Sequence, residues 1–170
     1  KHYTPANAIL VGAGNIVTEQ VYELAVKWFG DIPPGQRYER NVPLEPEQRE
    51  ARRMDITAEV PVDAFLKTWH MPSRMDPRYY PVDLITDILG SGASSRLYQS
   101  LVKEQQLFTN VDCYHFGSSD AGLLCIDGKL VKGVAPEKAE AAVMEQLQKL
   151  QQEGVNVAEL EKVKNKTEST

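Results

Sequence analysis

The pattern that most constrains the fold is a pair of short β-type segments that occurs twice along the chain. Residues 53–60 and 64–71 are separated by three residues, and residues 110–116 and 122–130 by a turn at 117–120. In the first segment apolar and polar residues alternate, which is typical of a strand with one face in water. Strands joined by so few residues pair in antiparallel hairpins. The sequence therefore predicts two hairpins in a mainly antiparallel sheet.

Amphipathic segments around these hairpins predict the helices, because their apolar residues recur at helical spacing. Asn156 and Glu159 form a capping-box pattern at the start of the last one. An apolar run at residues 7–12 predicts one further strand. The expected helices are 18–29, 82–89, from Ser94 or Ser95 to about 105, 136–153, and from 157 onward. The order β-α-β-β-α-α-β-β-α-α indicates an α+β fold, a two-layer sandwich of a mostly antiparallel mixed sheet with helices packed on one face.

Length and composition indicate a soluble globular protein. The 170 residues suit a single domain, 1–170, in which the polar, proline-bearing residues 36–52 form an irregular surface connection. No apolar run approaches the roughly 20 residues that a membrane-spanning helix needs. A net charge of −5 with scattered lysines and arginines does not favour nucleic-acid binding. The compartment stays open, as cytoplasm or periplasm for a bacterial protein.

Two glycine-containing turns raise the question of nucleotide binding. The turn Gly12-Ala13-Gly14-Asn15-Ile16-Val17 joins a predicted strand to a helix, but Val17 replaces the third glycine of a dinucleotide-binding motif and no second parallel strand follows. The loop from Gly90 to Arg96 lacks the Gly-Lys-Ser/Thr ending of a phosphate-binding loop. Nucleotide binding is therefore disfavoured for both turns, and a plain connection between two elements is the main alternative for each.

Residues with metal-binding or nucleophilic chemistry do not form a recognisable set. The histidines are His2, His70 and His115, and none has another His or a Cys at helical ligand spacing, whereas zinc needs three or four converging ligands. Cys113 and Cys125 flank the predicted turn and are expected to be buried free thiols. We therefore predict no catalytic, cofactor-binding or metal-binding residue in this chain.

Three ordered motifs resemble the pitrilysin/insulinase family of zinc metallopeptidases. They are His2–Asn15 followed by Lys27–Pro33, then Trp69-His70-Met71-Pro72, then Leu89–Tyr98 with Leu101 and Glu104 after it. Their order and spacing fit over essentially the whole chain. The resemblance is to the second domain of a half-molecule, because the inverted His-x-x-Glu-His motif of the first domain does not occur in this sequence.

The resemblance implies a non-catalytic domain, a fragment of a larger zinc-dependent metallopeptidase. Zinc is expected in the first domain of the parent protein and not in this chain. The implied partners are that zinc-binding domain, the opposite half or subunit, and a peptide substrate enclosed between the halves. Family domains that contact substrate from the opposite half carry an Arg and a Tyr where this chain has Val102 and Thr109. This domain is therefore expected to follow a zinc-binding domain.

The resemblance also implies a candidate substrate-facing loop, because related processing peptidases engage substrate through a glycine-rich loop at this place. Its residues here are Gly90, Ser91, Gly92, Ala93, Ser94, Ser95 and Arg96. The predicted function is support of the zinc domain and lining of the substrate chamber, with no peptidase activity in the chain alone and metalloendopeptidase activity in the parent. The alternative is a domain of a catalytically inactive family member that acts as an assembly or binding scaffold.

Overall fold

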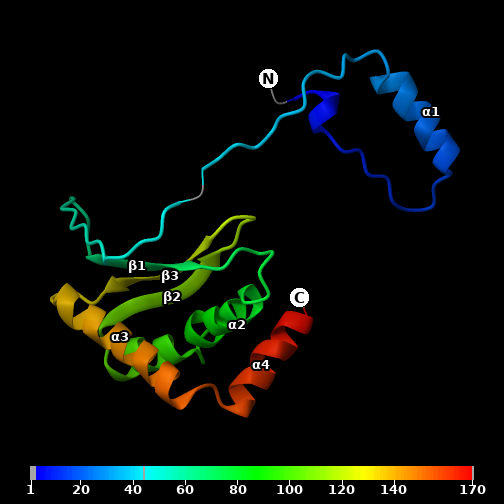
Figure 1. The fold of residues 1–170 in the computed structure, drawn as a ribbon. Coiled ribbons are helices and arrows are strands. Elements are labelled where there is room, and N and C mark those ends of the chain that lie inside the picture. Colours follow the sequence, from blue (N-terminus) through cyan, green and yellow to red (C-terminus); the bar gives the residue numbers. More distant parts are fainter. Residues whose placement is uncertain (1–2, 44, 170) are drawn as a thin grey trace. The chain divides into compact units, whose positions relative to one another are not determined.

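The structure, a computed structural model, describes residues 3–43 and 45–169. The chain forms two units, residues 1–49 and residues 50–170, which are treated separately below (Figure 1). The division between them falls within the polar, proline-bearing segment 36–52.

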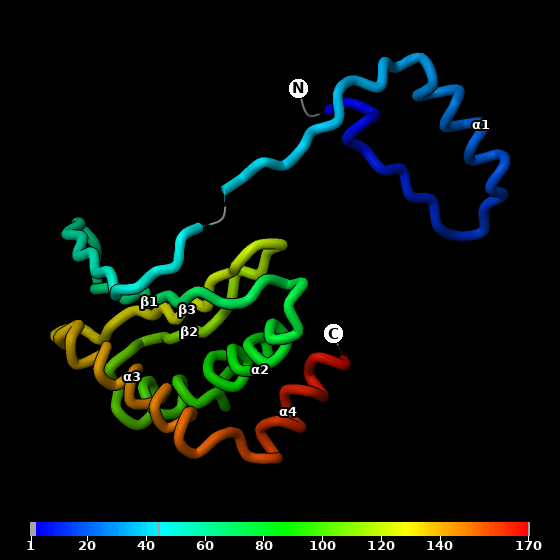
Figure 2. Tube along the Cα trace, in the orientation of Figure 1, coloured from blue at the N-terminus to red at the C-terminus, as the bar shows by residue number. Residues whose placement is uncertain are grey.

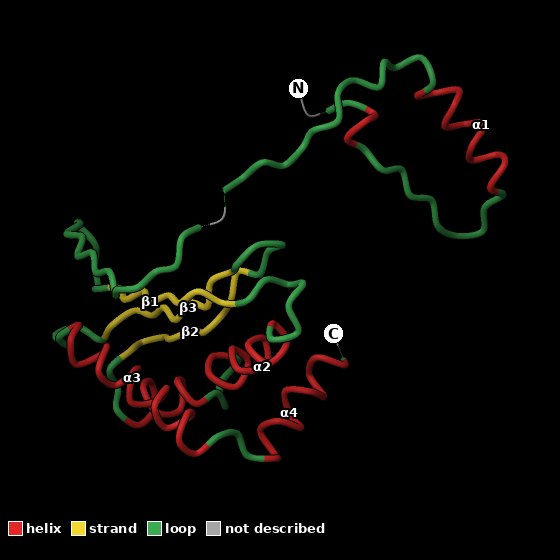
Figure 3. The backbone as a smooth tube through the Cα atoms, in the orientation of Figure 1, coloured by secondary structure: helices red, strands yellow, loops and turns green. Residues whose placement is uncertain are grey.

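The second unit is built on a three-stranded antiparallel sheet. Its strands are β1 (Ala64–Met71), β2 (Phe108–Phe116) and β3 (Gly122–Leu130), in the spatial order β1-β3-β2 (Figure 3). Trp69 on β1 and His115 on β2 both pair with Leu124 on β3, so these three side chains share one face of the sheet. The hairpin of β2 and β3 forms as the sequence predicts, with Ser118 and Asp120 bonded to each other in its turn.

The helices of this unit lie on one face of the sheet (Figures 1 and 2). They are α2 (Tyr79–Gly90), the π-helical segment η2 (Tyr98–Glu104), α3 (Pro136–Glu153) and α4 (Val157–Glu168). Their apolar stripes and the covered side of the sheet make one core. Its fully buried large side chains include Leu89, Leu97, Leu101, Phe108, Ile126, Leu130 and Val143. The α+β class with helices packed on one face of the sheet is confirmed.

The starts of α3 and α4 follow the local sequence signals. Pro136 opens α3, where its missing N–H would have had no partner. Asn156 accepts a hydrogen bond from the Glu159 N–H at 2.9 Å while the Glu159 carboxylate accepts one from the Asn156 N–H, so the predicted capping box is confirmed. The helix expected from Ser94 or Ser95 is π-helical over most of its length, and Gln106 just beyond it has a left-handed φ of 52°.

The first unit contains a short 3-10 turn, η1 (Pro5–Asn7), and one helix, α1 (Thr18–Phe29) (Figure 2). The Asn7 side chain connects η1 to the segment that follows α1. Its Nδ2 donates to the Gln36 carbonyl at 3.2 Å, and its Oδ1 accepts from the Tyr38 N–H at 2.5 Å. No residue that the structure describes in this unit is buried. The unit therefore has no core of its own.

Two of the five predicted strands, 7–12 and 53–60, do not form, and the described pairings are all antiparallel rather than mixed. An extended segment becomes a strand only when its N–H and C=O groups pair with a neighbour. For residues 53–60 the one backbone bond described is the local one from Val60 N–H to the Ala58 carbonyl. Alternation of apolar and polar residues shows the preference for a pleated conformation but does not supply the partner.

Candidate functional site

The loop from Gly90 to Arg96 joins α2 to η2, and a close backbone approach holds its first residue. Gly90 is buried, and a Cβ built on it would lie 2.1 Å from the Cys113 backbone nitrogen. Gly92 has a φ of 77°, a conformation that side-chain-bearing residues rarely adopt, although a Cβ there would meet no atom within 4 Å. The two glycines therefore serve different purposes: Gly90 lets α2 contact β2, and Gly92 turns the chain.

Helix α4 holds this loop from one side through two lysines placed one turn apart. Lys166 Nζ lies 3.0 Å from Asp87 Oδ1, at the end of α2, and donates to Ser91 Oγ at 2.5 Å. Lys162 donates to Ser94 Oγ. These side chains border a small hollow of about 30 Å³ between α4 and the loop. The positions of Ser91 and Ser94 are thus set by a helix more than 60 residues further along the chain.

Arg96, the last residue of the loop, makes a bidentate ion pair with Glu159 on α4. Its Nε and one terminal nitrogen bond the two Glu159 carboxylate oxygens at 2.8 and 2.7 Å, a bidentate geometry, and the same terminal nitrogen donates to the Gly154 carbonyl at 2.9 Å. The Arg96 hydrogen bond holds the pKa of Glu159 below its ordinary value, with the Asn156 N–H adding to the effect. Glu159 therefore serves both the capping box and the ion pair.

The predicted loop residues divide into a held part and an open part. Ser95 is buried, and its hydroxyl has no partner among the described residues, so it does not cap the following helix. Gly92, Ala93 and Ser94 are exposed and form the tip. The carbonyls of Gly92 and Ala93 already accept hydrogen bonds from the Ser95 N–H and from Gln99 Nε2. With no charged or nucleophilic group activated here, the tip can offer the N–H groups of Gly92 and Ala93 to a ligand, which supports binding rather than chemistry.

The two histidines that the structure describes, His70 and His115, do not converge on a metal site, and His2 lies outside the described residues. His70 pairs with Leu123, whereas His115 pairs with Leu124, the next residue of the same strand, so the two imidazoles lie on opposite faces of the sheet. Cys113 shares the face of His115, but both ring nitrogens of His115 already have partners. No group of three or more His, Cys, Asp or Glu residues that could hold a metal is found among residues 3–43 and 45–169. The residues present therefore do not fit zinc.

His115 belongs to a polar cluster between β2 and α2 that sequence reasoning missed. Tyr79 Oη lies 2.7 Å from His115 Nε2, and Thr86 Oγ1 and Asp83 Oδ1 lie 3.4 and 3.6 Å from Nδ1. Because the Thr86 hydroxyl donates its proton to the Asp83 carbonyl, Nδ1 carries the imidazole proton and Nε2 accepts from Tyr79. Tyr79 is buried, and the cluster fixes α2 on the sheet.

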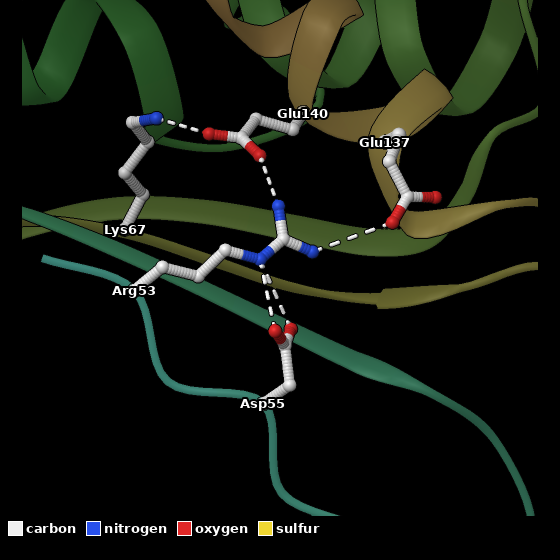
Figure 4. A network of polar contacts seen from close by, with 5 residues as sticks. All are labelled: Arg53, Asp55, Lys67, Glu137 and Glu140. Atoms are coloured by element: carbon white, nitrogen blue, oxygen red, sulfur yellow. Dashed lines mark hydrogen bonds and ion pairs between the residues drawn. The ribbon is translucent and has the colours of Figure 1, made fainter.

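A second unpredicted network joins the segment before β1 to the start of α3 (Figure 4). Arg53 lies between Asp55 at 3.1 Å, Glu137 at 3.4 Å and Glu140 at 3.3 Å, and Lys67 on β1 contacts the second oxygen of Glu140. Glu137 and Glu140 are spaced i, i+3 at the helix N-terminus, which favours carboxylates. That spacing was visible in the sequence, but the partners come from a segment more than 80 residues away.

The two cysteines are buried and free, as expected. Cys113 pairs with Ile126, the neighbour of Cys125, so the two thiols lie on opposite faces and are not placed for a disulfide. Burial raises the pKa of the Cys113 thiol to about 12 and also raises that of Cys125. Neither is an activated nucleophile.

The two positions that depart from the family pattern have structural roles here. Val102 packs against the core from η2, and Thr109 donates to the Lys129 carbonyl at 3.1 Å, where the pairing of β2 with β3 is irregular.

The uncovered face of the sheet is the other surface with binding potential. Leu66, Leu123 and Phe116 are exposed on it, and Leu66, Tyr114, Asp127 and Lys129 help to line a shallow hollow of about 290 Å³. Tyr114 Oη donates to Asp127 at 3.1 Å. This face thus exposes apolar, aromatic and charged groups together.

Comparison with known proteins gives a consistent picture. The sequence family described as peptidase M16 inactive domain matches residues 1–167. The zinc protease PqqE of Helicobacter pylori is 26% identical over 96% of this chain and 37% of its own length. The zinc protease YmxG of Bacillus subtilis is likewise 26% identical, over 96% of this chain and 39% of its own length. A crystal structure of a protease from Helicobacter pylori matches with a TM-score of 0.82 at 21% identity, over 92% of this chain and 38% of that one. The chain thus spans less than half the length of these relatives.

Proposed function

Because this chain belongs to the family of peptidase M16 inactive domains, which confirms the resemblance read from its sequence, we propose that it is the non-catalytic second domain of a zinc-dependent metallopeptidase. In this role it supports the zinc-binding domain, lines the substrate chamber and leaves the chemistry to that domain. The observation that carries the proposal is the family match over residues 1–167, with curated relatives named zinc proteases. His70, His115, Cys113 and Cys125 are dispersed over both faces of the sheet, which supports the assignment of zinc to another part of the parent protein.

The exposed face of the sheet and the tip of the Gly90–Arg96 loop are the surfaces that we propose to face an enclosed peptide. Leu66 and Phe116 offer apolar contact on the sheet. At the tip, the N–H groups of Gly92 and Ala93, for which no hydrogen bond is described, can pair with an extended chain. The contacts of the loop with α4 support this role because they fix the tip on a rigid element, so that binding would cost little conformational entropy.

The first experiment asks whether the parent protein has the proposed chemistry. The full-length protein should contain stoichiometric zinc by elemental analysis and should cleave an unstructured peptide in a chelator-sensitive manner. The 170-residue chain should do neither. A full-length protein that binds no zinc and cleaves no peptide contradicts the peptidase assignment and favours the scaffold alternative.

The second experiment tests the loop with a matched pair of glycines. Gly92 and Gly133 both have a left-handed φ, 77° and 88°, and a Cβ on either would meet no atom within 4 Å. Gly92→Trp and Gly133→Trp in the full-length protein should therefore lose similar, modest stability. Only Gly92→Trp should reduce kcat/KM for peptide. Equal turnover in the two variants would reduce the loop to a connection between α2 and η2.

A further inference from the structure

The tip of the Gly90–Arg96 loop presents hydrogen-bond donors whose neighbouring acceptors are already used. No hydrogen bond is described for the N–H groups of Gly92 and Ala93, and both residues are exposed. Their carbonyls, in contrast, accept hydrogen bonds from the Ser95 N–H and from Gln99 Nε2. A ligand that meets this tip therefore gains most if it only accepts hydrogen bonds.

Two serine hydroxyls of the loop add further donors. Ser91 Oγ accepts from Lys166 at 2.5 Å. Ser94 Oγ accepts from Lys162 in the same way, because an ammonium group can only donate. Each hydroxyl therefore keeps its own proton, and no acceptor for either proton is described in residues 3–43 and 45–169. An ammonium that donates to the oxygen polarises the O–H bond and makes it a stronger donor.

The charges around the loop leave one cation without a described carboxylate partner. Arg96 pairs with Glu159, and Lys166 lies 3.0 Å from Asp87. For Lys162, within the part of the chain that the structure describes, the one contact is the serine hydroxyl at the tip. Because that contact already orders the long Lys162 side chain, a ligand at the tip would meet a positive charge at little further cost in entropy.

The space beside the loop fits a small group. Ser91, Ser94, Lys162 and Lys166 help to line the hollow of about 30 Å³ between α4 and the loop. One buried water needs roughly 10–15 Å³ of such space, so the hollow admits one or two oxygen atoms and not the phosphate chain of a nucleotide. A carboxylate has two acceptor oxygens and one negative charge, which match both the donors and the unpaired cation.

We propose that the tip of the Gly90–Arg96 loop and Lys162 on α4 together bind a carboxylate group of the enclosed peptide. The donors are the N–H groups of Gly92 and Ala93, the Ser94 hydroxyl and the Lys162 ammonium. This inference rests on the proposed function, which supplies the peptide, and it names the group by which the loop recognises that peptide. A C-terminal carboxylate and an Asp or Glu side chain have the same chemistry, so the experiment distinguishes these two sources.

Acetate, the simplest carboxylate probe, tests the site on the 170-residue chain by NMR. The amide signals of Gly92 and Ala93 should shift saturably with sodium acetate and stay in place in sodium chloride of equal ionic strength. Lys162→Met keeps an unbranched side chain but removes the charge, and it should weaken the acetate response about 10-fold. The matched control is Lys164→Met, on the same helix, because Lys164 is exposed and no contact with the loop is described for it. This variant should respond as the wild type does, and the amides of β3 should stay unchanged in both variants as evidence of folding.

Peptide binding to the full-length protein tests whether the bound carboxylate belongs to the substrate. The probe is an unstructured peptide with one Glu and a free C-terminus, and fluorescence anisotropy in the presence of a chelator measures its Kd without turnover. Lys162→Met should raise this Kd about 10-fold, and Lys164→Met should leave it within about twofold.

Three altered peptides identify the source of the carboxylate. One has Gln in place of the Glu, one has an amidated C-terminus, and one has both changes. The effect of Lys162→Met should disappear with the change that removes the bound carboxylate, and it should be absent for the peptide with both changes. A purely structural role of Lys162, as a support for Ser94, would instead weaken the binding of all four peptides alike.

The contrary results separate this inference from the proposed function. Amide signals that ignore acetate, an unchanged Kd in Lys162→Met, or an equal effect on all four peptides would overturn the carboxylate site and leave the peptidase assignment intact. A full-length protein that binds none of the four peptides contradicts the proposed function, and this inference with it. Because the acetate titration uses neither zinc nor peptide, the two failures are distinguishable.

Discussion

Replacement of Glu159 by glutamine should cost the chain a measurable part of its stability, because this residue joins the capping box of α4 to the loop. Arg96 contacts both carboxylate oxygens at 2.7 and 2.8 Å, and the side chains are only 19% and 29% exposed. Glutamine retains the capping role at the third helical position but removes the charge and places an NH₂ group against the guanidinium.

The expected loss of unfolding free energy in Glu159→Gln lies between two limiting cases. Fully exposed ion pairs contribute about 0.2–1 kcal/mol, and removal of one partner from a fully buried pair costs about 3–5 kcal/mol. A bidentate pair at this partial exposure places the expected loss for Glu159→Gln at about 1–2 kcal/mol. Glu161→Gln, on the exposed side of the same helix, should change stability by less than about 0.5 kcal/mol.

Urea unfolding of the two variants and the wild type, followed by circular dichroism at 222 nm, measures these differences. A double-mutant cycle with Arg96→Met isolates the interaction energy of the Arg96–Glu159 pair from the effect that each substitution has by itself. The pKa of Glu159 is lowered in the folded state, so the contribution of the pair is present above the unfolded pKa and is lost as the pH falls through the folded one. The coupling should therefore persist at pH 7 and vanish in acid. Equal stabilities of Glu159→Gln and Glu161→Gln at pH 7 would refute the reasoning.

Three further predictions follow from local geometry. Gly90→Ala should lose at least about 3 kcal/mol in urea unfolding because its Cβ would meet the Cys113 nitrogen at 2.1 Å, whereas Gly92→Ala should lose about 1 kcal/mol from its backbone conformation alone. Glu140→Gln should destabilise the chain at pH 7 and be neutral in acid, since the hydrogen bond from Lys67 holds the Glu140 pKa below its ordinary value; a pH-independent loss would contradict this. Cys113, with its pKa raised to about 12, should resist alkylation at pH 8 until the chain is unfolded, as mass spectrometry after timed labelling would show.

Local signals in the sequence were sufficient for the elements whose partners are close in the chain. The β2–β3 hairpin, the start of α3 at Pro136 and the Asn156–Glu159 capping box all depend on residues a few positions apart, and all are present. Strands 7–12 and 53–60 carried equally good local patterns and did not form, since strand formation needs a paired neighbour that a pattern cannot supply.

The candidate site shows the same limit. The composition of the loop and its place in the family pattern identified Gly90–Arg96 as the segment of interest. Nothing in its sequence indicated that α4 would hold Ser91, Ser94 and Arg96 and leave only the tip exposed. The His115 cluster and the Arg53 network were missed for the same reason, because His115 lies 29 residues from Thr86 and Arg53 lies 87 residues from Glu140.

The sequence by itself determined the class of fold, the helix boundaries set by caps and prolines, the absence of a zinc-binding motif and the membership of a peptidase family. These properties depend on side-chain periodicity, on backbone groups within one turn and on ordered motifs, all of which are local. Only the tertiary structure decided which face His70, His115 and the two cysteines occupy, which loop atoms remain accessible and which apolar surfaces lack a cover. Those outcomes depend on strand register and helix packing, where a shift of one residue moves a side chain to the opposite face of the sheet.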